Sequence, residues 1–304
     1  MRSLGAAVLV GGLLALVSQR AAAAPCCMSA TAFGMGRLAI WEDFALGLRT
    51  SLSPALGAWD AEGHWSSYDD YADLEWRSEL WALVALDRRL SAFVRLPVVA
   101  THRSAGSLSG FGGGLGEVSL GARYEVLAIG EIAELPAIAL TLAVLAPTGR
   151  ATEDAETPLG VDVTGRGAWV LSAGLSLEVT RVPWFVRLDL GLSVPLPARR
   201  DDLGVSQRLG PSFDLGLAGG VEVSPRVVVS LASHLMLSSD NILDGTAVPH
   251  SDRLELGLGP AVSWHFAWSW TLQLGVDSGL FLSDLGQNLP GRVTTTLGLR
   301  YGSP

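Results

Sequence analysis

The chain has 304 residues, of which 49% are hydrophobic and 17% are charged, and its formal net charge is −9. This composition excludes an intrinsically disordered chain, and the acidic balance argues against nucleic acid as a partner, because nucleic-acid binding needs a basic surface. All 21 basic residues are arginine. The sequence therefore also excludes functions that need a lysine amine, such as P-loop, Schiff-base and protein-kinase chemistry.

The N-terminal residues have the layout of a secretory signal. Arg2 precedes an apolar run from Leu4 to Val17, and small residues follow from Ala21 to Ala24. The apolar run is shorter than the roughly 20 residues that a membrane-spanning helix needs. We therefore predict a cleaved signal peptide over residues 1–24.

After the leader, hydrophobic residues alternate with small or charged ones, which is the period of a β-strand. Between Trp184 and Leu196 the even-numbered residues are apolar, whereas the odd-numbered ones include Arg187, Asp189 and Ser193. No later segment offers 18 consecutive apolar residues, so a chain that crosses a membrane would have to cross with strands. The alternation predicts twelve strands, over residues 38–50, 72–86, 90–100, 115–128, 136–146, 165–180, 184–196, 209–223, 226–238, 252–266, 269–282 and 292–301.

Short and long connections alternate between these runs. Short ones, such as Asp87 to Arg89, would join strands at one end, and long ones rich in Gly and Asp, such as 51–71 and 101–114, would join them at the other. This is the layout of an up-and-down antiparallel outer-membrane barrel, which pairs its backbone N–H and C=O groups internally. We predict an all-β transmembrane β-barrel of about 12 strands over residues 38–304, in the outer membrane of a Gram-negative bacterium.

The second face of the strands distinguishes this barrel from a secreted β-sandwich, which also alternates apolar and polar residues. A sandwich has a solvated surface with Lys- or Glu-rich edges. Here the second face is rich in Gly, Ala, Ser and Thr, which suits the crowded inside of a narrow barrel. Aromatic residues at the short-turn ends predict a periplasmic girdle, formed by Trp81, Trp184, Trp264, Phe266, Trp268, Trp270 and Tyr301.

One segment of the chain resembles a known family, and another resembles a known assembly signal. Gly114–Tyr124 (GLGEVSLGARY) and a following strand that ends in Pro147-Thr148-Gly149 resemble the outer-membrane family named for the meta pathway of phenol degradation, although Glu117 stands where Asp is expected. This resemblance implies a barrel that passes small, often hydrophobic compounds. The stretch Thr296–Tyr301 resembles the signal by which the barrel-assembly machinery recognises a last strand, although Gly302-Ser303-Pro304 follow it.

If the small and charged face points inward, side chains of both signs line the lumen. One permitted register places Glu178 opposite Arg187, and another places Asp214 opposite His234. Such charges would either brace a narrow interior or line a polar path that sets ion preference. The lumen-lining candidates are Glu117, Arg123, Glu125, Glu178, Arg187, Asp189, Asp214, Glu222, His234, Arg253, Glu255, Asp277, Arg292 and Arg300.

Enzymes are the main alternative class, since some outer-membrane barrels are lipid hydrolases that use serine and histidine. Ser263 and His265 lie two residues apart, but their face should point into the barrel and no G-x-S-x-G motif is present. His64, His102 and His250 fall on separate predicted loops. We therefore expect no catalytic residue.

We also expect no metal and no cofactor. Cys26 and Cys27 are adjacent, which suits neither a zinc site nor an unstrained disulfide. The sequence favours a monomeric channel or transporter for passive passage of small solutes, with residues 25–37 as a stopper for its lumen. Its expected partners are outer-membrane lipid, a small-molecule solute and the barrel-assembly machinery. A structural or adhesive barrel without an open pore is the alternative.

Overall fold

The computed structural model describes residues 36–132, 134–200, 205–281 and 285–303. The predicted signal peptide and most of the predicted stopper lie outside these residues. In the described part, twelve long antiparallel strands form one wall. They are β1 (Phe44–Trp59), β3 (Tyr71–Ala85), β4 (Leu90–Ala105), β6 (Ser119–Leu127), β7 (Ala137–Leu145), β8 (Val170–Arg181), β9 (Trp184–Pro195), β12 (Ser212–Ser224), β13 (Val227–Ser238), β16 (Arg253–Ala267), β17 (Trp270–Gly279) and β19 (Leu289–Ser303).

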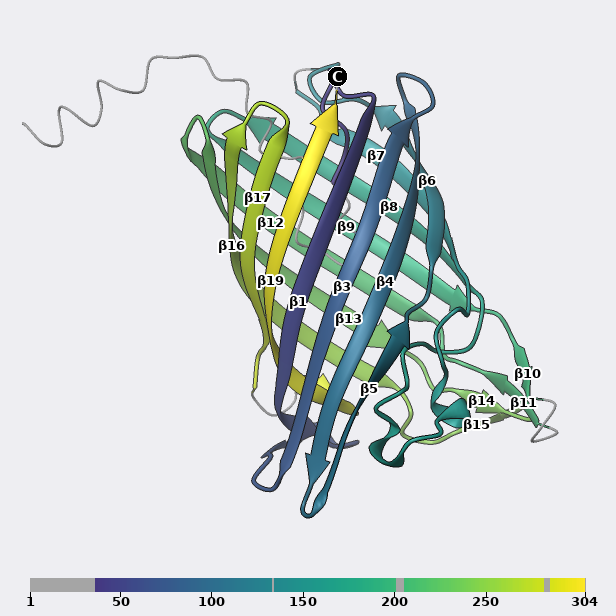
Figure 1. The fold of residues 1–304 in the computed structure, drawn as a ribbon. Coiled ribbons are helices and arrows are strands. Elements are labelled where there is room, and N and C mark those ends of the chain that lie inside the picture. Colours follow the sequence, from purple (N-terminus) through teal and green to yellow (C-terminus); the bar gives the residue numbers. More distant parts are fainter. Residues whose placement is uncertain (1–35, 133, 201–204, 282–284, 304) are drawn as a thin grey trace, which may run out of the picture.

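These strands follow one another around the wall in chain order (Figure 1). The ring closes where β1 pairs with β19, from Phe44 opposite Ser303 to Trp59 opposite Leu289. Every long strand therefore has a hydrogen-bonded neighbour on both sides, and the predicted all-β, up-and-down barrel is confirmed. Among the described residues, no helix is long and apolar enough to span a membrane.

The two ends of the barrel differ. The short connections lie at the upper end in Figure 1, where β1 begins and β19 ends, and the long connections lie at the lower end. The long connections carry additional short elements. These are β2 (Trp65–Ser67), β5 (Leu108–Leu115), β18 (Gly286–Gln287), two 3-10 turns, η2 (Thr152–Asp154) and η3 (Pro158–Gly160), and a small separate sheet of β10 (Ala198–Arg200), β11 (Val205–Arg208), β14 (Ile242–Leu243) and β15 (Thr246–Ala247).

The first predicted strand was placed too early in the chain. It was expected over 38–50, but β1 runs through the predicted loop as far as Trp59 and contains Pro54. The pairing of β1 with β19 has a gap at this proline, between Leu52 and Ala55, and the register shifts just beyond it, between Ala55 and Gly57. A proline, which lacks a backbone N–H, is tolerated where no ladder hydrogen bond is needed.

The predicted loop 101–114 is also wrong. Its residues extend β4 and form β5, which pair from Val98 opposite Leu115 to Ala105 opposite Leu108. Gly106 turns the chain between the two strands with a φ of +56°, a left-handed conformation that glycine adopts without strain. The predicted strand 115–128 begins only at Ser119, because Gly116 donates its N–H to the carbonyl of Pro97 at 2.8 Å and ends the hairpin.

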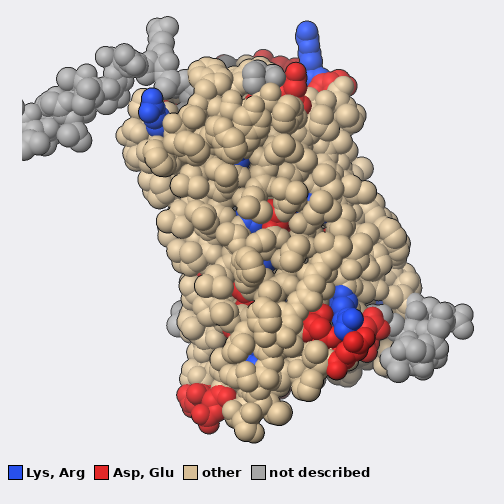
Figure 2. Space-filling model, in the orientation of Figure 1, with Lys and Arg blue, Asp and Glu red and all other residues tan. Residues whose placement is uncertain are grey.

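The wall has an apolar outer face. Large hydrophobic residues alternate along each strand with small or charged ones, and the hydrophobic members are exposed although they lie in the middle of strands. Figure 2 shows a flank that is almost free of charge, with Arg, Asp and Glu mainly near the two ends. A closed antiparallel barrel with an apolar flank is the form in which strands cross a bilayer, and the chain is therefore an outer-membrane protein.

Trp81 does not belong to the aromatic girdle as predicted. It lies on the inner face, and a Cβ on Gly47, the residue opposite it on β1, would come within 2.3 Å of its ring. The strand β3 carries Trp76 on the outer face and Trp81 on the inner face, so its aromatic residues follow no single face. The other predicted girdle rings gather near the short turns, with Trp270 and Tyr301 at a centroid distance of 5.0 Å.

A charge on the outer face should destabilise the barrel in lipid. Leu231 is 51% exposed on β13, and Leu231→Arg should lower the free energy of unfolding in lipid vesicles by about 2 to 4 kcal/mol, because the guanidinium would meet acyl chains. Leu243→Arg, at a 42% exposed position of the small separate sheet, is the matched control and should change the free energy of unfolding little. Equal effects in urea titrations would contradict the assignment of the lipid-facing surface.

Candidate functional site

The structure places the predicted lumen residues at different depths. Those with buried side chains are Glu117, Arg123, Glu178, Arg187, Asp189 and Arg300. Those that are half-buried are Glu125, Asp214, Glu222, His234, Glu255, Asp277 and Arg292, and Arg253 is exposed. In each strand they alternate with the exposed hydrophobic residues, and they are therefore on the inner face. Glu117 lies between β5 and β6, where it accepts hydrogen bonds from the backbone N–H of Arg166 at 2.7 Å and from its Nε at 3.1 Å.

The best-buried charges form a cluster on β8 and β9. Glu178 is opposite Arg187, which confirms the predicted register. Arg187 Nε donates to both carboxylate oxygens of Asp189 at 2.9 Å, and Nη2 donates to Ser176 Oγ at 3.2 Å. Because the carboxylate of Asp189 also accepts from Ser176 at 2.5 Å, this cluster braces two neighbouring strands.

The predicted pairing of Asp214 with His234 is wrong. Asp214 is opposite Met236, and His234 is opposite Gly216. The turn consists of residues 225 and 226, one residue later than the predicted strands implied, and this displaces the pairing of the two strands. A bulge between Glu222 and Ser224 adds a residue to β12 and shifts the register once more.

His234 instead faces two carboxylates on the next strands. Its Nδ1 lies 3.4 Å from Asp277 Oδ2 and its Nε2 lies 3.6 Å from Glu255 Oε1. Gly257 is opposite His234 on β16, and a Cβ there would come within 2.2 Å of the imidazole ring. The ring therefore lies against the wall between two acids.

The sequence analysis missed several inner charges on the first strands. Arg49 Nη2 donates to Glu79 Oε1 at 2.7 Å, and Arg292 Nη2 donates to Asp73 Oδ2 at 2.6 Å. Arg95 lies on β4, where its Nη2 donates to Ser119 Oγ at 3.2 Å. The odd-numbered positions of β3 could have revealed its inner face, but the two tryptophans of that strand, at positions of opposite parity, obscured the pattern.

The residues just before β1 enter the short-turn end of the barrel. Arg37 and Ala39 are buried, and Gly36 lines an internal cavity. Glu42 forms a bidentate ion pair with Arg300 of the last strand, in which Nη1 donates to Oε1 at 2.7 Å. The backbone N–H of Asp43 donates to the carbonyl of Ser303 at 2.8 Å, so this segment is held by the last strand.

Among the cavities that the described residues form, three border the inner wall of the barrel. One of about 490 Å³ is lined by inner residues of β4, β6, β7, β8, β9, β12 and β13 and by the long loops. A smaller one, of about 230 Å³, shares Arg95 and Arg166 with it. A third, of about 660 Å³, lies at the short-turn end, and Arg123 lines both this cavity and the first one.

The connection between β7 and β8 packs against β5 at the end opposite the short turns. Val161 is 1% exposed, and a Cβ on Gly112 of β5 would come within 2.9 Å of its backbone. Asp162 accepts from Arg150 Nη1 at 2.6 Å, from the N–H of Glu156 at 2.9 Å and from the hydroxyl of Thr157. These donors, Thr157 foremost, hold the pKa of Asp162 far below its usual range.

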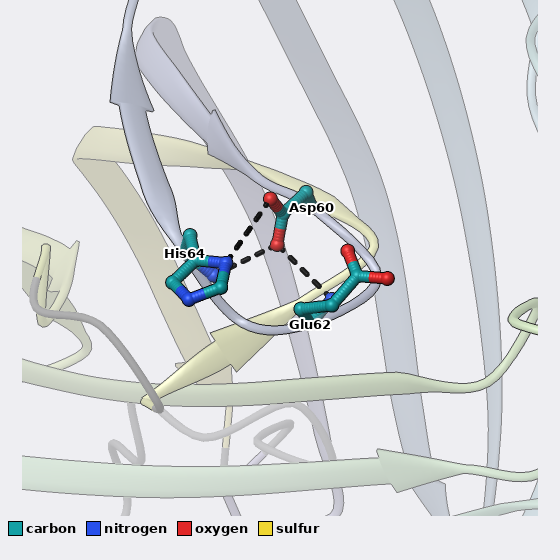
Figure 3. A group of neighbouring side chains, drawn as sticks. All are labelled: Asp60, Glu62 and His64. Atoms are coloured by element: carbon teal, nitrogen blue, oxygen red, sulfur yellow. Dashed lines mark hydrogen bonds and ion pairs between the residues drawn. The ribbon is translucent and has the colours of Figure 1, made fainter.

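One group of possible metal ligands lies in the turn between β1 and β2 (Figure 3). Asp60 Oδ1 accepts from the N–H groups of His64 at 2.8 Å and Glu62 at 3.0 Å, and Oδ2 lies 3.4 Å from His64 Nδ1. The hydrogen bond from the His64 N–H is the main cause that lowers the pKa of Asp60. All three side chains are exposed, and these bonds explain their arrangement as a turn.

The arrangement of Ser263 and His265 does not favour hydrolysis. Ser263 is buried on the inner face of β16. His265 Nδ1 lies 2.9 Å from the hydroxyl of Thr271 on the neighbouring strand. Within the residues that the structure describes, Ser263 and His265 share no hydrogen bond, so no activated nucleophile is formed.

Comparison with known proteins extends to solved structures alone, since no family model and no curated protein matches the chain. The COG4313 outer membrane channel from Pseudomonas putida F1 is 17% identical, with a TM-score of 0.72, over 88% of this chain and 97% of that one. The NanC porin is 7% identical, with a TM-score of 0.48, over 84% of this chain and 98% of that one. At 17% identity, the similarity to the COG4313 channel shows a shared outer-membrane barrel fold.

Removal of Arg187 should destabilise the barrel. Arg187 is 2% exposed and Asp189 is 3% exposed, so Arg187→Met would remove the cation that neutralises the buried Asp189 carboxylate and should lower the free energy of unfolding by about 3 to 5 kcal/mol. Arg226→Met, at an exposed position of a short turn, should change it by less than about 0.5 kcal/mol. A loss below about 1 kcal/mol for Arg187→Met, in urea titrations in lipid vesicles, would contradict a bracing role.

Asp162 should hold the β7–β8 connection in place well into the acidic range. A carboxylate whose folded pKa is depressed stabilises the fold above its ordinary pKa of about 4 and loses this contribution as the pH falls below that value. Amide hydrogen exchange in residues 150–165 should therefore stay slow at pH values down to about 5, and Asp162→Asn should accelerate it at neutral pH. Asp69→Asn, at an exposed position of the loop before β3, is the control, and unchanged exchange in Asp162→Asn would contradict this anchoring.

Proposed function

We propose that the protein is an outer-membrane channel for the passive passage of small solutes, and that it acts as a monomer. The observation that supports this most is the pair of internal cavities, of about 490 and 660 Å³, which both reach Arg123. The interior of the barrel is therefore not packed solid, and a path through it would pass the guanidinium of this residue. A purely structural barrel has no need of such space.

The inner wall favours polar solutes over hydrophobic ones. The cavities are bordered largely by arginine, carboxylate, hydroxyl and small groups, with a few large hydrophobic residues such as Leu83 and Phe93, whereas most large hydrophobic residues are on the outside. A hydrocarbon solute would have to displace water from these groups without replacing their hydrogen bonds, which is costly. Small polar or charged solutes can exchange water for side-chain contacts in each cavity.

Residues 25–37 would narrow this path from the short-turn end. The described end of that segment supports the proposal, because Gly36 already lines the cavity of about 490 Å³ and Arg37 is buried. The ion pair between Glu42 and Arg300 fixes where the segment enters the barrel. The preceding residues would therefore occupy the lumen rather than leave it.

Membership of the family named for the meta pathway of phenol degradation is part of this proposal. The segment Gly114–Tyr124 and the Pro147-Thr148-Gly149 sequence support it. In the fold they meet, since Thr148 Oγ1 donates to the carbonyl of Gly116 at 2.5 Å and accepts from the N–H of Val118 at 2.9 Å. The two parts of the resemblance thus form one contact at the start of β6.

Conductance of the refolded mature protein in a planar bilayer tests the channel. The intact protein should give discrete current steps, and a variant that lacks residues 25–37 should give larger ones, because the lumen is then wider. Arg123→Ala should also raise the conductance, since it opens the junction of the two cavities, whereas Arg226→Ala at the exposed turn should not. No current from either the intact or the shortened protein would favour the structural or adhesive barrel.

A further inference from the structure

We infer that the cavity of about 490 Å³ binds a small organic carboxylate, an inference that rests on the proposed channel and names its class of solute. The charged groups that line this cavity are four arginines, Arg95, Arg123, Arg166 and Arg253, and two carboxylates, Glu153 and Asp214. Positive charge is therefore in excess among its described lining residues. A pocket with such an excess concentrates anions.

Two of these arginines lack the partners that a bracing role would supply. Arg95 makes one side-chain hydrogen bond, to Ser119 Oγ at 3.2 Å, and its Nε is buried without a partner. Arg123 is 9% exposed, and its Nε makes no hydrogen bond and only a loose ion pair, 3.9 Å from Glu125 Oε1. Among the described residues, Arg95 has no carboxylate oxygen within ion-pair distance.

The contrast with Arg187 shows what is unusual about Arg95. Arg187 is braced by a bidentate carboxylate and a hydroxyl on the adjoining strand. Burial of a guanidinium without such a partner costs free energy. A solute that brings its own carboxylate would remove this cost, because the two oxygens of a carboxylate match the planar donor fork of arginine.

The acidic residues of the cavity are partly engaged elsewhere. Glu153 accepts a hydrogen bond from Gln207 Nε2 at 2.7 Å. Asp214 lies on β12, whereas Arg95 is on β4 and Arg123 on β6, and Asp214 interacts electrostatically with Arg166. Among the described residues, neither acid lies within ion-pair distance of Arg95, so the carboxylate of a solute would displace no partner there.

The remaining wall gives the site its preference for an organic anion. Leu83, Phe93, Ala143 and Leu145 line the cavity beside small residues, and they offer an apolar surface for a short carbon chain. Arg95 also borders the smaller cavity of about 230 Å³, whose two carboxylates are already paired, Glu79 with Arg49 and Glu117 with Arg166. A solute could therefore place its carboxylate on Arg95 and its carbon chain against the apolar residues, and then pass to Arg123.

Calorimetric titration of the intact, detergent-solubilised protein tests the site without any need for conduction. Hexanoate should bind at least about tenfold more tightly than hexanamide, which has the same chain and no charge. Arg95→Gln should weaken hexanoate at least about tenfold and leave hexanamide unchanged. Arg226→Gln removes the same charge at an exposed turn and should leave both affinities unchanged.

Several outcomes would overturn the inference. These are equal binding of hexanoate and hexanamide, unchanged hexanoate binding in Arg95→Gln, or inorganic phosphate that binds as tightly as hexanoate. Heat-dependent gel mobility shows whether each variant is folded. If Arg95→Gln does not fold, Arg95→Lys keeps the charge but not the donor fork and should still weaken hexanoate several-fold, whereas an unchanged affinity would contradict the site.

The same measurements separate this inference from the proposed channel. Hexanoate that binds at Arg95 in a protein without conductance would contradict the channel and support the site. A conducting protein that does not distinguish hexanoate from hexanamide would support the channel and contradict the site. Hexanoate that reduces the single-channel current of the intact protein, but not of Arg95→Gln, would support both.

Discussion

The backbone of a chain in hydrocarbon must find all its hydrogen-bond partners within the protein. Here this requirement is met by a ring in which the first long strand pairs with the last. Two prolines, which have no backbone N–H, lie where the hydrogen-bonded pairing of neighbouring strands is interrupted. Pro54 lies in a gap of the pairing between β1 and β19, and Pro260 lies in a gap of the pairing between β16 and β17. The positions of these prolines follow from the same requirement.

A second constraint acts inside the ring, because twelve strands enclose little space. Large inner rings are accommodated by a glycine directly opposite on the neighbouring strand. This holds for Trp81 over Gly47, Phe93 over Gly121, Phe185 over Gly220 and His234 over Gly257, since a Cβ on each of these glycines would come within 2.4 Å of the ring. Each of these inner-face glycines is therefore needed to make room for the ring that lies opposite it.

Sequence patterns were most informative where one physical rule dominates. Alternation between lipid and interior predicted twelve strands and their faces, and the tight turn before Trp184 predicted the pairing of Glu178 with Arg187. Patterns failed where strands leave the bilayer or change length. The β4–β5 hairpin extends among the long loops, where no lipid imposes alternation, and the bulge near Glu222 shifts the register of Asp214. Side-chain parity records a face but not a register.

The inner charges divide into two kinds once their partners are known. Arg49, Arg187, Arg292 and Arg300 each hold a carboxylate on the same or another element, and these pairs tie strands together or fix the segment before β1. Arg95 lies on the inner face of β4 and, among the described residues, has no such pair. Removing a guanidinium from water is costly whether or not it is paired. Bracing of the strands explains why the paired arginines are present on the inner face, but it does not explain the presence of Arg95. The sequence could not separate the two groups, because both have the same residue type on the same face.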